Sequence, residues 1–298
     1  MRRTDLALEA KEMYHENAGG TSDIEGVRAT TEECDGITVT TVEILNKKGK
    51  EALQKEIGTY ITIEMPAFRQ HGHLFYQSGS HAVKKALHRL TDLQKGDDVL
   101  VVGLGNRNIT PDALGSLVTD KLIVTRHLHN LMPDAVKNLG TVSCVAPGVM
   151  GITGMETAEI IRQLVPLVKP KAIFAVDALA ARSINRISTT VQLSDTGISP
   201  GSGIGNRRAS LSRDTLGIPV IAIGVPMVID SETLIHDAFL SQNSTPSANK
   251  IFYPQSEQLI VTPKDVDRIL THMSALVAAG INMALHDLSL EEIADFVG

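Results

Sequence analysis

The sequence predicts an α/β fold with a mainly parallel sheet and helices on both faces. Short apolar runs of strand length recur along the chain, at 99–103, 142–146, 172–176 and 219–224. Helix-like stretches lie between most of them, at 111–121, 154–168 and 178–187. Strands that are apolar along their whole length are typical of a parallel sheet buried on both faces. Without an internal repeat or a clear linker, the chain predicts one domain with additions at its edges.

The N-terminal third predicts the additional elements. Residues 4–17 have the spacing of a short amphipathic helix, and β-branched, alternating runs at 36–48 and 58–66 predict two more strands with a short helix between them. A helix is expected over 80–96 with Ser80 as its N-cap. Thr262 and Pro263 are expected to begin a long C-terminal helix as N-cap and first helical residue.

Composition and charge exclude several classes of protein. The chain has 298 residues, of which 43% are hydrophobic and 21% charged, as in ordinary globular proteins. A net charge of -6 gives no basic surface for direct nucleic-acid binding. No apolar run approaches the roughly 20 residues of a membrane span. Two cysteines, Cys34 and Cys144, cannot form a disulfide framework and favour a reducing, cytoplasmic compartment.

The first candidate site follows the apolar run 99–102. In open parallel sheets, ligands bind beyond the carboxyl ends of the strands. Gly103 and Gly105 permit a tight turn there, and Asn106 can hydrogen-bond locally. Thr110 and the following proline predict a helix start, which places Asp112 in a first helical turn where backbone N–H groups stabilise a carboxylate.

Asp177 is the second candidate, at the end of the third apolar run. An acid at the tip of a buried strand is desolvated and must be paired or protonated. If the strands before Asp112 and Asp177 are adjacent, the two carboxylates face one crevice and share a proton. Such a pair can activate a water and protonate a leaving group. The structural alternative is that each aspartate only caps the helix after it.

Two other loops could contribute to the same crevice. The loop after the second run contains Gly148 and Gly151 and could hold a substrate backbone through its N–H groups. Asp195 follows another strand-like run and is a candidate third acid. The Gly- and Ser-rich segment 194–214 predicts a long loop that is mobile and close to the substrate cleft.

Competing chemistries have weaker signals. A dinucleotide fingerprint would need a third glycine where Asn108 stands. His127 and His129 form an HxH pair without a third metal ligand at a suitable spacing. No GxSxG elbow is present, and neither cysteine lies in a loop suited to a nucleophile. We therefore expect no cofactor and no metal. A metal-dependent peptidase and a nucleotide-binding module that uses the GLGN loop remain the alternatives.

Five segments resemble the germination proteases of spore-forming Firmicutes, in the order found in that family. They are RRTDLALEA, VVGLGNRNITPDALG, APGVMGITGMET, FAVDALAARS and TVQLSDTGISPGSGIGNRR. The resemblance covers essentially the whole chain. It implies an atypical aspartic endopeptidase whose fold is similar to that of hydrogenase-maturation endopeptidases, with the two catalytic aspartates at Asp112 and Asp177.

The resemblance also implies a biological setting. Proteases of this family degrade small acid-soluble spore proteins at germination, act as homotetramers and are made in the forespore as self-processing zymogens. We therefore expect this chain in the cytoplasm of the forespore and in the spore core. The propeptide is usually longer in the family, whereas only Met1–Asp5 precede Leu6 here.

The start of the chain resembles a substrate of the family. Its substrates are cut after an acidic residue that is followed by a large apolar residue and then alanine, and Asp5, Leu6 and Ala7 present that order. We therefore expect residues 1–5 to be a propeptide, residues 6–298 to be a single peptidase domain, and self-cleavage to occur between Asp5 and Leu6, favoured at mildly acidic pH.

Overall fold

In the described part of the chain, nine strands form one sheet. The computed structural model describes residues 4–20, 23–94, 96–200, 209–240 and 259–297. The strand order is β1-β2-β3-β7-β8-β6-β4-β5, with β9 paired to β8. The strands are β1 (Val27–Cys34), β2 (Ile37–Ile44), β3 (Gly58–Glu64), β4 (Asp98–Gly103), β5 (Thr141–Val145), β6 (Ala172–Ala181), β7 (Thr190–Ser194), β8 (Val220–Asp230) and β9 (Ile260–Val261).

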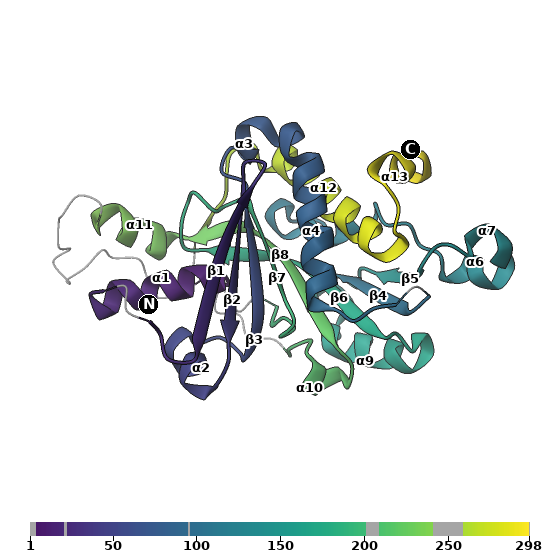
Figure 1. Cartoon of the computed structure of the whole chain (residues 1–298), viewed down its shortest axis with the longest axis horizontal. Helices are drawn as coiled ribbons and strands as arrows, with labels where there is room; N and C mark the ends of the chain where they lie inside the picture. The colour runs from purple at the N-terminus through teal and green to yellow at the C-terminus, as the bar shows by residue number, and fades with distance from the viewer. Residues whose placement is uncertain (1–3, 21–22, 95, 201–208, 241–258, 298) are drawn as a thin grey trace.

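The parallel part of the sheet is made of β8, β6, β4 and β5. The other pairs are antiparallel: β1 with β2, β2 with β3, β3 with β7, β7 with β8 and β8 with β9. The expected α/β class is confirmed, with a parallel half that is continued by antiparallel strands into a mixed sheet (Figure 1). β4 and β6, the strands that precede the two candidate aspartates, are neighbours.

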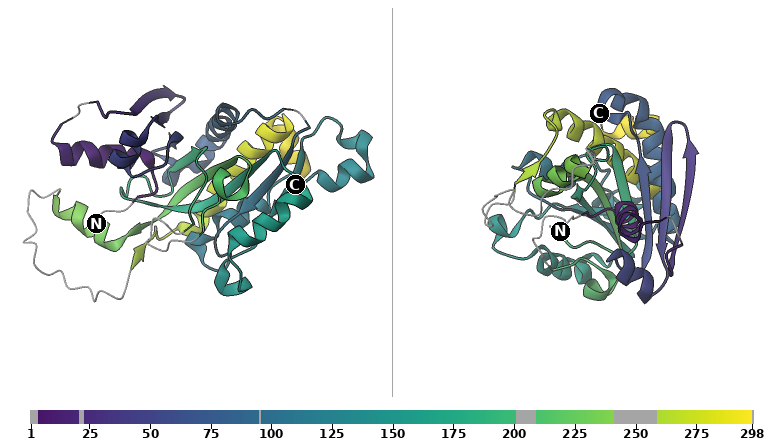
Figure 2. Two further views of the ribbon diagram at one scale, coloured as in Figure 1. Left: turned by 90° about the horizontal axis from the view of Figure 1, so that it is seen from below. Right: turned by 90° about the vertical axis from the view of Figure 1, so that its left-hand side faces the viewer.

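Helices cover both faces of the sheet, as expected (Figure 2). The longer ones are α1 (Ala7–Ala18), α4 (Tyr76–Leu90), α9 (Thr157–Val168), α11 (Ser231–Leu240), α12 (Val266–His286) and α13 (Leu290–Val297). The short ones are α2 (Lys47–Leu53), α3 (Phe68–His71), α5 (Leu114–Thr119), α6 (Arg126–Leu131), α7 (Pro133–Val136), α8 (Met150–Thr153), α10 (Arg213–Leu216) and two 3₁₀ turns, η1 (Gly72–Phe75) and η2 (Thr110–Asp112).

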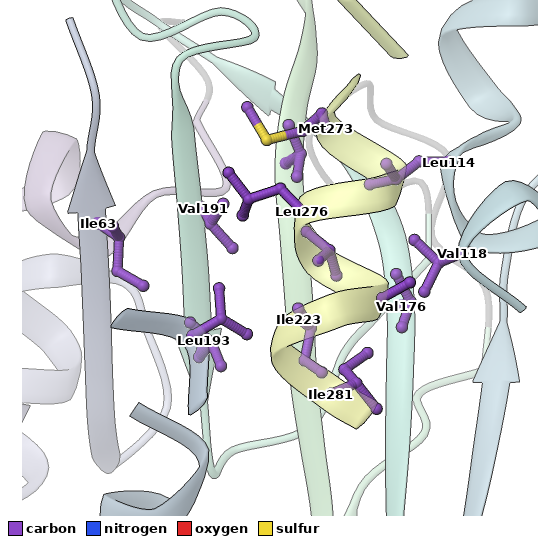
Figure 3. Close-up of a cluster of buried hydrophobic side chains, with 14 of the residues drawn as sticks. Ile63, Leu114, Val118, Val176, Val191, Leu193, Ile223, Met273, Leu276 and Ile281 are labelled. Atoms are coloured by element: carbon purple, nitrogen blue, oxygen red, sulfur yellow. The ribbon is translucent and has the colours of Figure 1, made fainter. Parts of the chain in front are cut away.

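The main core lies between the sheet and the helices α4, α5 and α12. Figure 3 shows α12, with Leu276 and Ile281, in front of the strands that carry Val191, Ile223 and Val176. Within the described residues, α12 is the one helix long and apolar enough to span a membrane. Most of its side chains are buried in this core, which identifies it as the central helix of the fold.

The strand β1 was not expected from the sequence. It is mostly exposed and carries polar side chains, so the apolar alternation of a half-buried strand is absent. Asp35 and Gly36 form the two-residue turn between Cys34 and Ile37, both with positive φ. An Asp-Gly pair is a strong hairpin signal, and it is the signal that could have predicted β1.

The helix expected over 178–187 is wrong. β6 continues through Asp177 to Ala181, paired with β8 as far as Ile229, and turns follow. The stretch 178–181 consists of alanine and leucine, which favour helices in isolation. Pairing with the buried strand β8 overrides that local preference.

Two expected helix caps are also wrong. Ser80 lies inside α4, where its hydroxyl donates to the carbonyls of Tyr76 and Leu276 and thereby joins α4 to α12. Helix α12 begins after Asp265, so Thr262 is not its cap. The Thr262 hydroxyl donates instead to the carbonyl of Met227.

The Gly- and Ser-rich segment is described only at its two ends, because residues 201–208 lie outside the described part of the chain. Its ends meet, since Ile198 and Leu211 exchange two backbone hydrogen bonds of 2.8 Å. The described parts of the segment are therefore fixed to each other and to the core, where Leu211 is buried.

Candidate active site

The GLGN loop follows β4 and lies against β6. The Leu104 N–H donates to the carbonyl of Val176 at 2.8 Å, which continues the β4–β6 ladder by one bond. A Cβ on Gly103 would lie 2.4 Å from the carbonyl oxygen of Gly115. Only a glycine lets α5 approach the loop this closely.

Gly105 shapes the loop in the same way. Its φ is +94°, and an added Cβ would lie 2.0 Å from the carbonyl oxygen of Asp112. Both the backbone conformation and the space therefore require glycine. The tight turn brings the next residue, Asn106, back towards Asp112.

Asp112 lies at the end of the single 3₁₀ turn η2, which begins after Ile109. The expected cap role of Thr110 is wrong, because no side-chain cap bond is present there. The Asp112 carboxylate accepts the Asn106 N–H at 2.7 Å through Oδ2. Asp112 does lie in the first turn of a helix, as expected, although that helix is a 3₁₀ turn. The backbone N–H that it binds comes from the GLGN loop.

Asp177 is the first residue of β6 beyond the end of β4, since Gly103 of β4 lies opposite Val176. Its side chain is 5% exposed, and Oδ1 accepts the N–H of Ala178 at 2.9 Å. The expectation of a buried carboxylate is confirmed. The expected position of Asp177 at the tip of its own strand is wrong, because β6 continues to Ala181. Asp177 does lie just beyond the end of the neighbouring strand, β4.

One loop therefore connects both aspartates. The residue before Asp177 accepts the N–H of Leu104, and Asp112 accepts the N–H of Asn106. η2 also packs against β6. Asp112 follows β4 and Asp177 lies on β6, so the two residues come from neighbouring parallel strands, near the point where β4 stops. That their carboxylates face one crevice and share a proton stays a prediction.

Asp195 lies elsewhere. It follows β7, as expected, but β7 runs antiparallel to β8 and carries it towards the amino ends of the parallel strands. Its Oδ1 accepts the N–H of Thr59 at 2.8 Å, at the beginning of β3. The structure gives Asp195 a contact at the beginning of β3, towards the amino ends of the parallel strands, whereas Asp177 lies beyond the carboxyl end of β4.

The loop after β5 extends into solvent at the carboxyl ends of the strands. Gly148 has a φ of +78°, Gly151 lies in the short helix α8, and an added Cβ at either would meet no atom within 4 Å. The two glycines are therefore not needed for packing. Their role as a substrate loop stays a prediction.

The segment before α1 is held inside the fold. Met1–Arg3 lie outside the described residues, but Leu6 and Ala7 are completely buried. The Asp5 N–H donates to the carbonyl of Ala180 at 2.9 Å, and the Asp5 Oδ2 accepts the Ala180 N–H at 2.8 Å. The expected cleavage site thus contacts the strand that carries Asp177.

Gln192 on β7 was missed by the sequence reasoning. Its Nε2 donates to the carbonyl of Asp5 at 3.1 Å, and its Oε1 accepts the N–H of Ala7 at 2.7 Å. The signal in the sequence was a buried amide inside an apolar strand, TVQLS, which needs partners but does not indicate which ones.

A group of charged residues fixes α1 beside the end of β6. Glu9 is completely buried and accepts the N–H groups of Arg182 and Ser183 at 2.6 and 2.9 Å. Burial raises the pKa of Glu9, against the lowering effect of these bonds, of the Thr4 hydroxyl and of the Arg186 charge. Arg186 itself binds Glu12 and Glu64 through its guanidinium.

Lys55 contacts the same segment. Its Nζ donates to the carbonyl of Thr4 at 2.9 Å. Burial lowers the pKa of Lys55, although the charges of Asp5 and Glu9 act in the opposite direction. The segment before α1 therefore lies beside two groups, Glu9 and Lys55, whose pKa values are shifted by burial.

Comparison with known proteins identifies the family. The sequence profile described as germination protease, peptidase family A25, matches residues 7–241. The chain is 44% identical to the germination protease of Clostridium acetobutylicum, over 99% of this chain and 98% of that one. It is 42% identical to that of Caldanaerobacter subterraneus, over 95% and 94%. This chain belongs to the germination protease family. The resemblance noted in the sequence is confirmed, and this member of the family is an aspartic-type peptidase.

One solved structure is also similar to this member of the germination protease family. The [NiFe] hydrogenase maturation protease HycI from Thermococcus kodakarensis is 17% identical, with a TM-score of 0.36, over 66% of this chain and 98% of that one.

Proposed function

We propose that this chain is the endopeptidase that begins the degradation of small acid-soluble spore proteins at germination, and that Asp112 and Asp177 are its catalytic pair. The observation that supports the pair most strongly is the hydrogen-bonding of the GLGN loop, which bonds to Asp112 at one end and to the residue before Asp177 at the other. Family membership supports the substrate class.

In the proposed mechanism, the two carboxylates share one proton. The ionised carboxylate takes a proton from a water molecule, whose oxygen attacks the carbonyl carbon of the scissile peptide. The protonated carboxyl then gives its proton to the amide nitrogen as the C–N bond breaks. One proton has been taken and one given, so the pair again holds one proton, and no acyl-enzyme forms.

The substrate test uses a purified small acid-soluble spore protein. We expect cleavage after an acidic residue by the wild-type chain and none by Asp177→Asn. Asp195→Asn provides a matched control, because asparagine keeps the oxygen that accepts the Thr59 N–H. We expect that variant to retain activity. Loss of activity with an unchanged melting temperature would return Asp195 to the catalytic set.

Two alternatives are tested by ligand removal and ligand addition. A metal-dependent peptidase would lose activity after exhaustive chelation, whereas the proposed aspartic mechanism predicts that activity persists. A nucleotide-binding module would show a thermal shift with NAD or ATP. We expect no shift with either nucleotide.

We also propose that the chain is a zymogen that removes Met1–Asp5 itself. The buried position of Leu6 and the hydrogen bond between Asp5 and Ala180 support this proposal, since Ala180 belongs to the same strand as Asp177. N-terminal mass analysis after incubation at mildly acidic pH should give a chain that begins at Leu6. Asp177→Asn should stay unprocessed. Equal processing in that variant would assign the cut to another protease.

A further inference from the structure

The segment Thr4–Ala7 is bound like a short peptide across one face of the sheet. Its backbone makes hydrogen bonds to two strands, to Ala180 on β6 and to the side chain of Gln192 on β7. β4 ends opposite Val176, so Ala180 has no partner on β4. The backbone of Ala180 bonds to Asp5 through both its N–H and its carbonyl. An acidic side chain at this position is therefore held by the strand itself.

The residue after the acid packs into an apolar cluster. Leu6 packs in a cluster with Leu179, Ala181, Ile187 and Ile229. Side chains two apart on a strand share a face, so Leu179 and Ala181 lie on the same face of β6 as Asp177. The cluster that holds the large apolar residue thus includes side chains on the face of β6 that carries Asp177.

Gln192 lies in the same row of the sheet as Asp177. Gly224 of β8 is opposite Asp177 on one side and opposite Gln192 on the other. Residues directly opposite one another point to the same face, and two strand spacings separate Asp177 from Gln192 by about 10 Å between Cα atoms. Gly224 between them carries no side chain, and the space above it holds the end of Leu179.

The bond that Gln192 holds is the expected scissile bond. The carbonyl that accepts from Nε2 belongs to Asp5, and therefore to the Asp5–Leu6 peptide. The Oε1 atom accepts the N–H of Ala7, which belongs to the next peptide along the chain. The two ends of one side-chain amide thus fix the carbonyl of the scissile bond and the peptide that follows it.

We propose that Gln192 is a positioning residue for self-processing, which holds the Asp5–Leu6 peptide on the Asp177 face and polarises its carbonyl through Nε2. This inference rests on the proposed self-processing. The amide gives and takes no proton. It orients the carbonyl carbon for the water that the aspartate pair activates.

The test compares three variants by the rate at which the chain beginning at Leu6 appears. Gln192→Glu keeps the shape and the acceptor for Ala7 but, when ionised, cannot donate to the Asp5 carbonyl. Gln192→Met keeps neither hydrogen bond. Thr190→Val is the matched control, because Thr190 lies on the same strand and face and its buried hydroxyl has no hydrogen-bond partner in the described structure.

We expect processing at neutral pH to be about tenfold or more slower in both Gln192 variants and unchanged in Thr190→Val. As the pH falls, the carboxyl introduced by Gln192→Glu becomes protonated and can donate again, so the rate of that variant should approach the wild-type rate while Gln192→Met stays slow. Asp5, Glu9, Lys55 and Asp177 are the other ionisable groups around this segment, so the quantity to compare is the ratio of variant to wild-type rate at each pH.

The failure of this inference can be told apart from failure of the proposed function. Wild-type rates in both Gln192 variants would overturn the role of Gln192. A defect in Gln192→Glu whose ratio to wild type is the same at every pH would assign Gln192 a purely structural role and would also overturn it. If the wild-type chain does not process itself and does not cleave a spore protein, the proposed function fails instead.

Discussion

At the scale of single residues, the two proposed catalytic carboxylates and the buried carboxylate of Glu9 bind different backbone groups. Asp112 and Asp177 accept backbone N–H groups close to the GLGN loop. Glu9, which is as deeply buried as Asp177, instead closes the turn after β6 by accepting the N–H groups of Arg182 and Ser183. These contacts support a structural role for Glu9, while the catalytic role of Asp112 and Asp177 stays a proposal.

Glu9 predicts a pH dependence of stability. Its pKa in the folded chain is raised above the ordinary 4.5. At a pH between 4.5 and this raised pKa, the folded chain therefore binds more protons than the unfolded chain. The stability that Glu9 contributes is complete below pH 4.5 and is lost as the pH rises through the folded pKa. Urea unfolding across this range should show that decline in wild type, and Glu9→Gln should remove it. Exposed Glu33→Gln is the control, and the same loss of slope there would contradict the assignment.

Arg186 predicts a second effect on stability. Its guanidinium binds Glu12 and Glu64, which belong to α1 and β3, and the side chain is 14% exposed. Arg186→Met should lower the free energy of unfolding by about 3 kcal/mol, because it leaves two carboxylates without their cation. Arg28→Met is the comparison, since Arg28 is exposed and pairs with Glu43 at 3.5 Å, and we expect about 1 kcal/mol or less there. An equal loss of unfolding free energy in the two variants would show that the ion pairs of Arg186 contribute no more to stability than the exposed pair of Arg28.

At the scale of elements, the sequence predicted the parallel strands better than it predicted their ends. The runs before Gly103 and Asp177 are apolar because both faces are covered, and that composition is visible without a structure. The continuation of β6 beyond Asp177 depends on pairing with β8, a partner about 45 residues further along the chain. Local composition cannot contain that information.

The same distinction applies to the candidate site. Asp112 and Asp177 were predictable as candidates because each follows an apolar run of strand length in the sequence. Gln192 was not, because its function depends on Asp5 and Ala7, which lie more than 180 residues earlier in the chain.

The turn at Gly105 predicts a loss of activity from a single methyl group. Gly105→Ala would place a Cβ 2.0 Å from the Asp112 carbonyl, where φ is +94°. We expect the loop to shift, the Asn106–Asp112 bond to be lost and cleavage to fall by about 100-fold or more. Gly217→Ala is the matched control, with a φ of +76° but open space around it. It should cost about 1 kcal/mol of stability and retain activity. Wild-type cleavage by Gly105→Ala would show that the loop geometry is not critical.

At the scale of the whole molecule, the N-terminal strands extend the sheet beyond β7, on the side away from β6 and β4. α1 packs against β2, α2 and the end of β6, while β1 forms the outer edge of the sheet (Figure 1). Removal of residues 1–5 leaves the ion pair between Glu12 and Arg186 in place. Activation should therefore be a local change around β6 and Gln192.

We also propose that the chain assembles as a homotetramer. Light scattering of the purified chain should give a mass of about four times 32.0 kDa. A mass of one chain at micromolar concentration would contradict the tetramer while leaving the catalytic assignment intact.

The claim that Asp112 and Asp177 act as one unit is tested most directly by the cleavage rate of a spore protein in four chains. These are wild type, Asp112→Asn, Asp177→Asn and the double variant, each with its melting temperature. We expect each single change to abolish cleavage as completely as the double change, because groups that share a proton are not additive. The melting temperatures should be unchanged or slightly raised, since one of two like charges is gone. Substantial cleavage by either single variant, with the fold intact, would contradict the account.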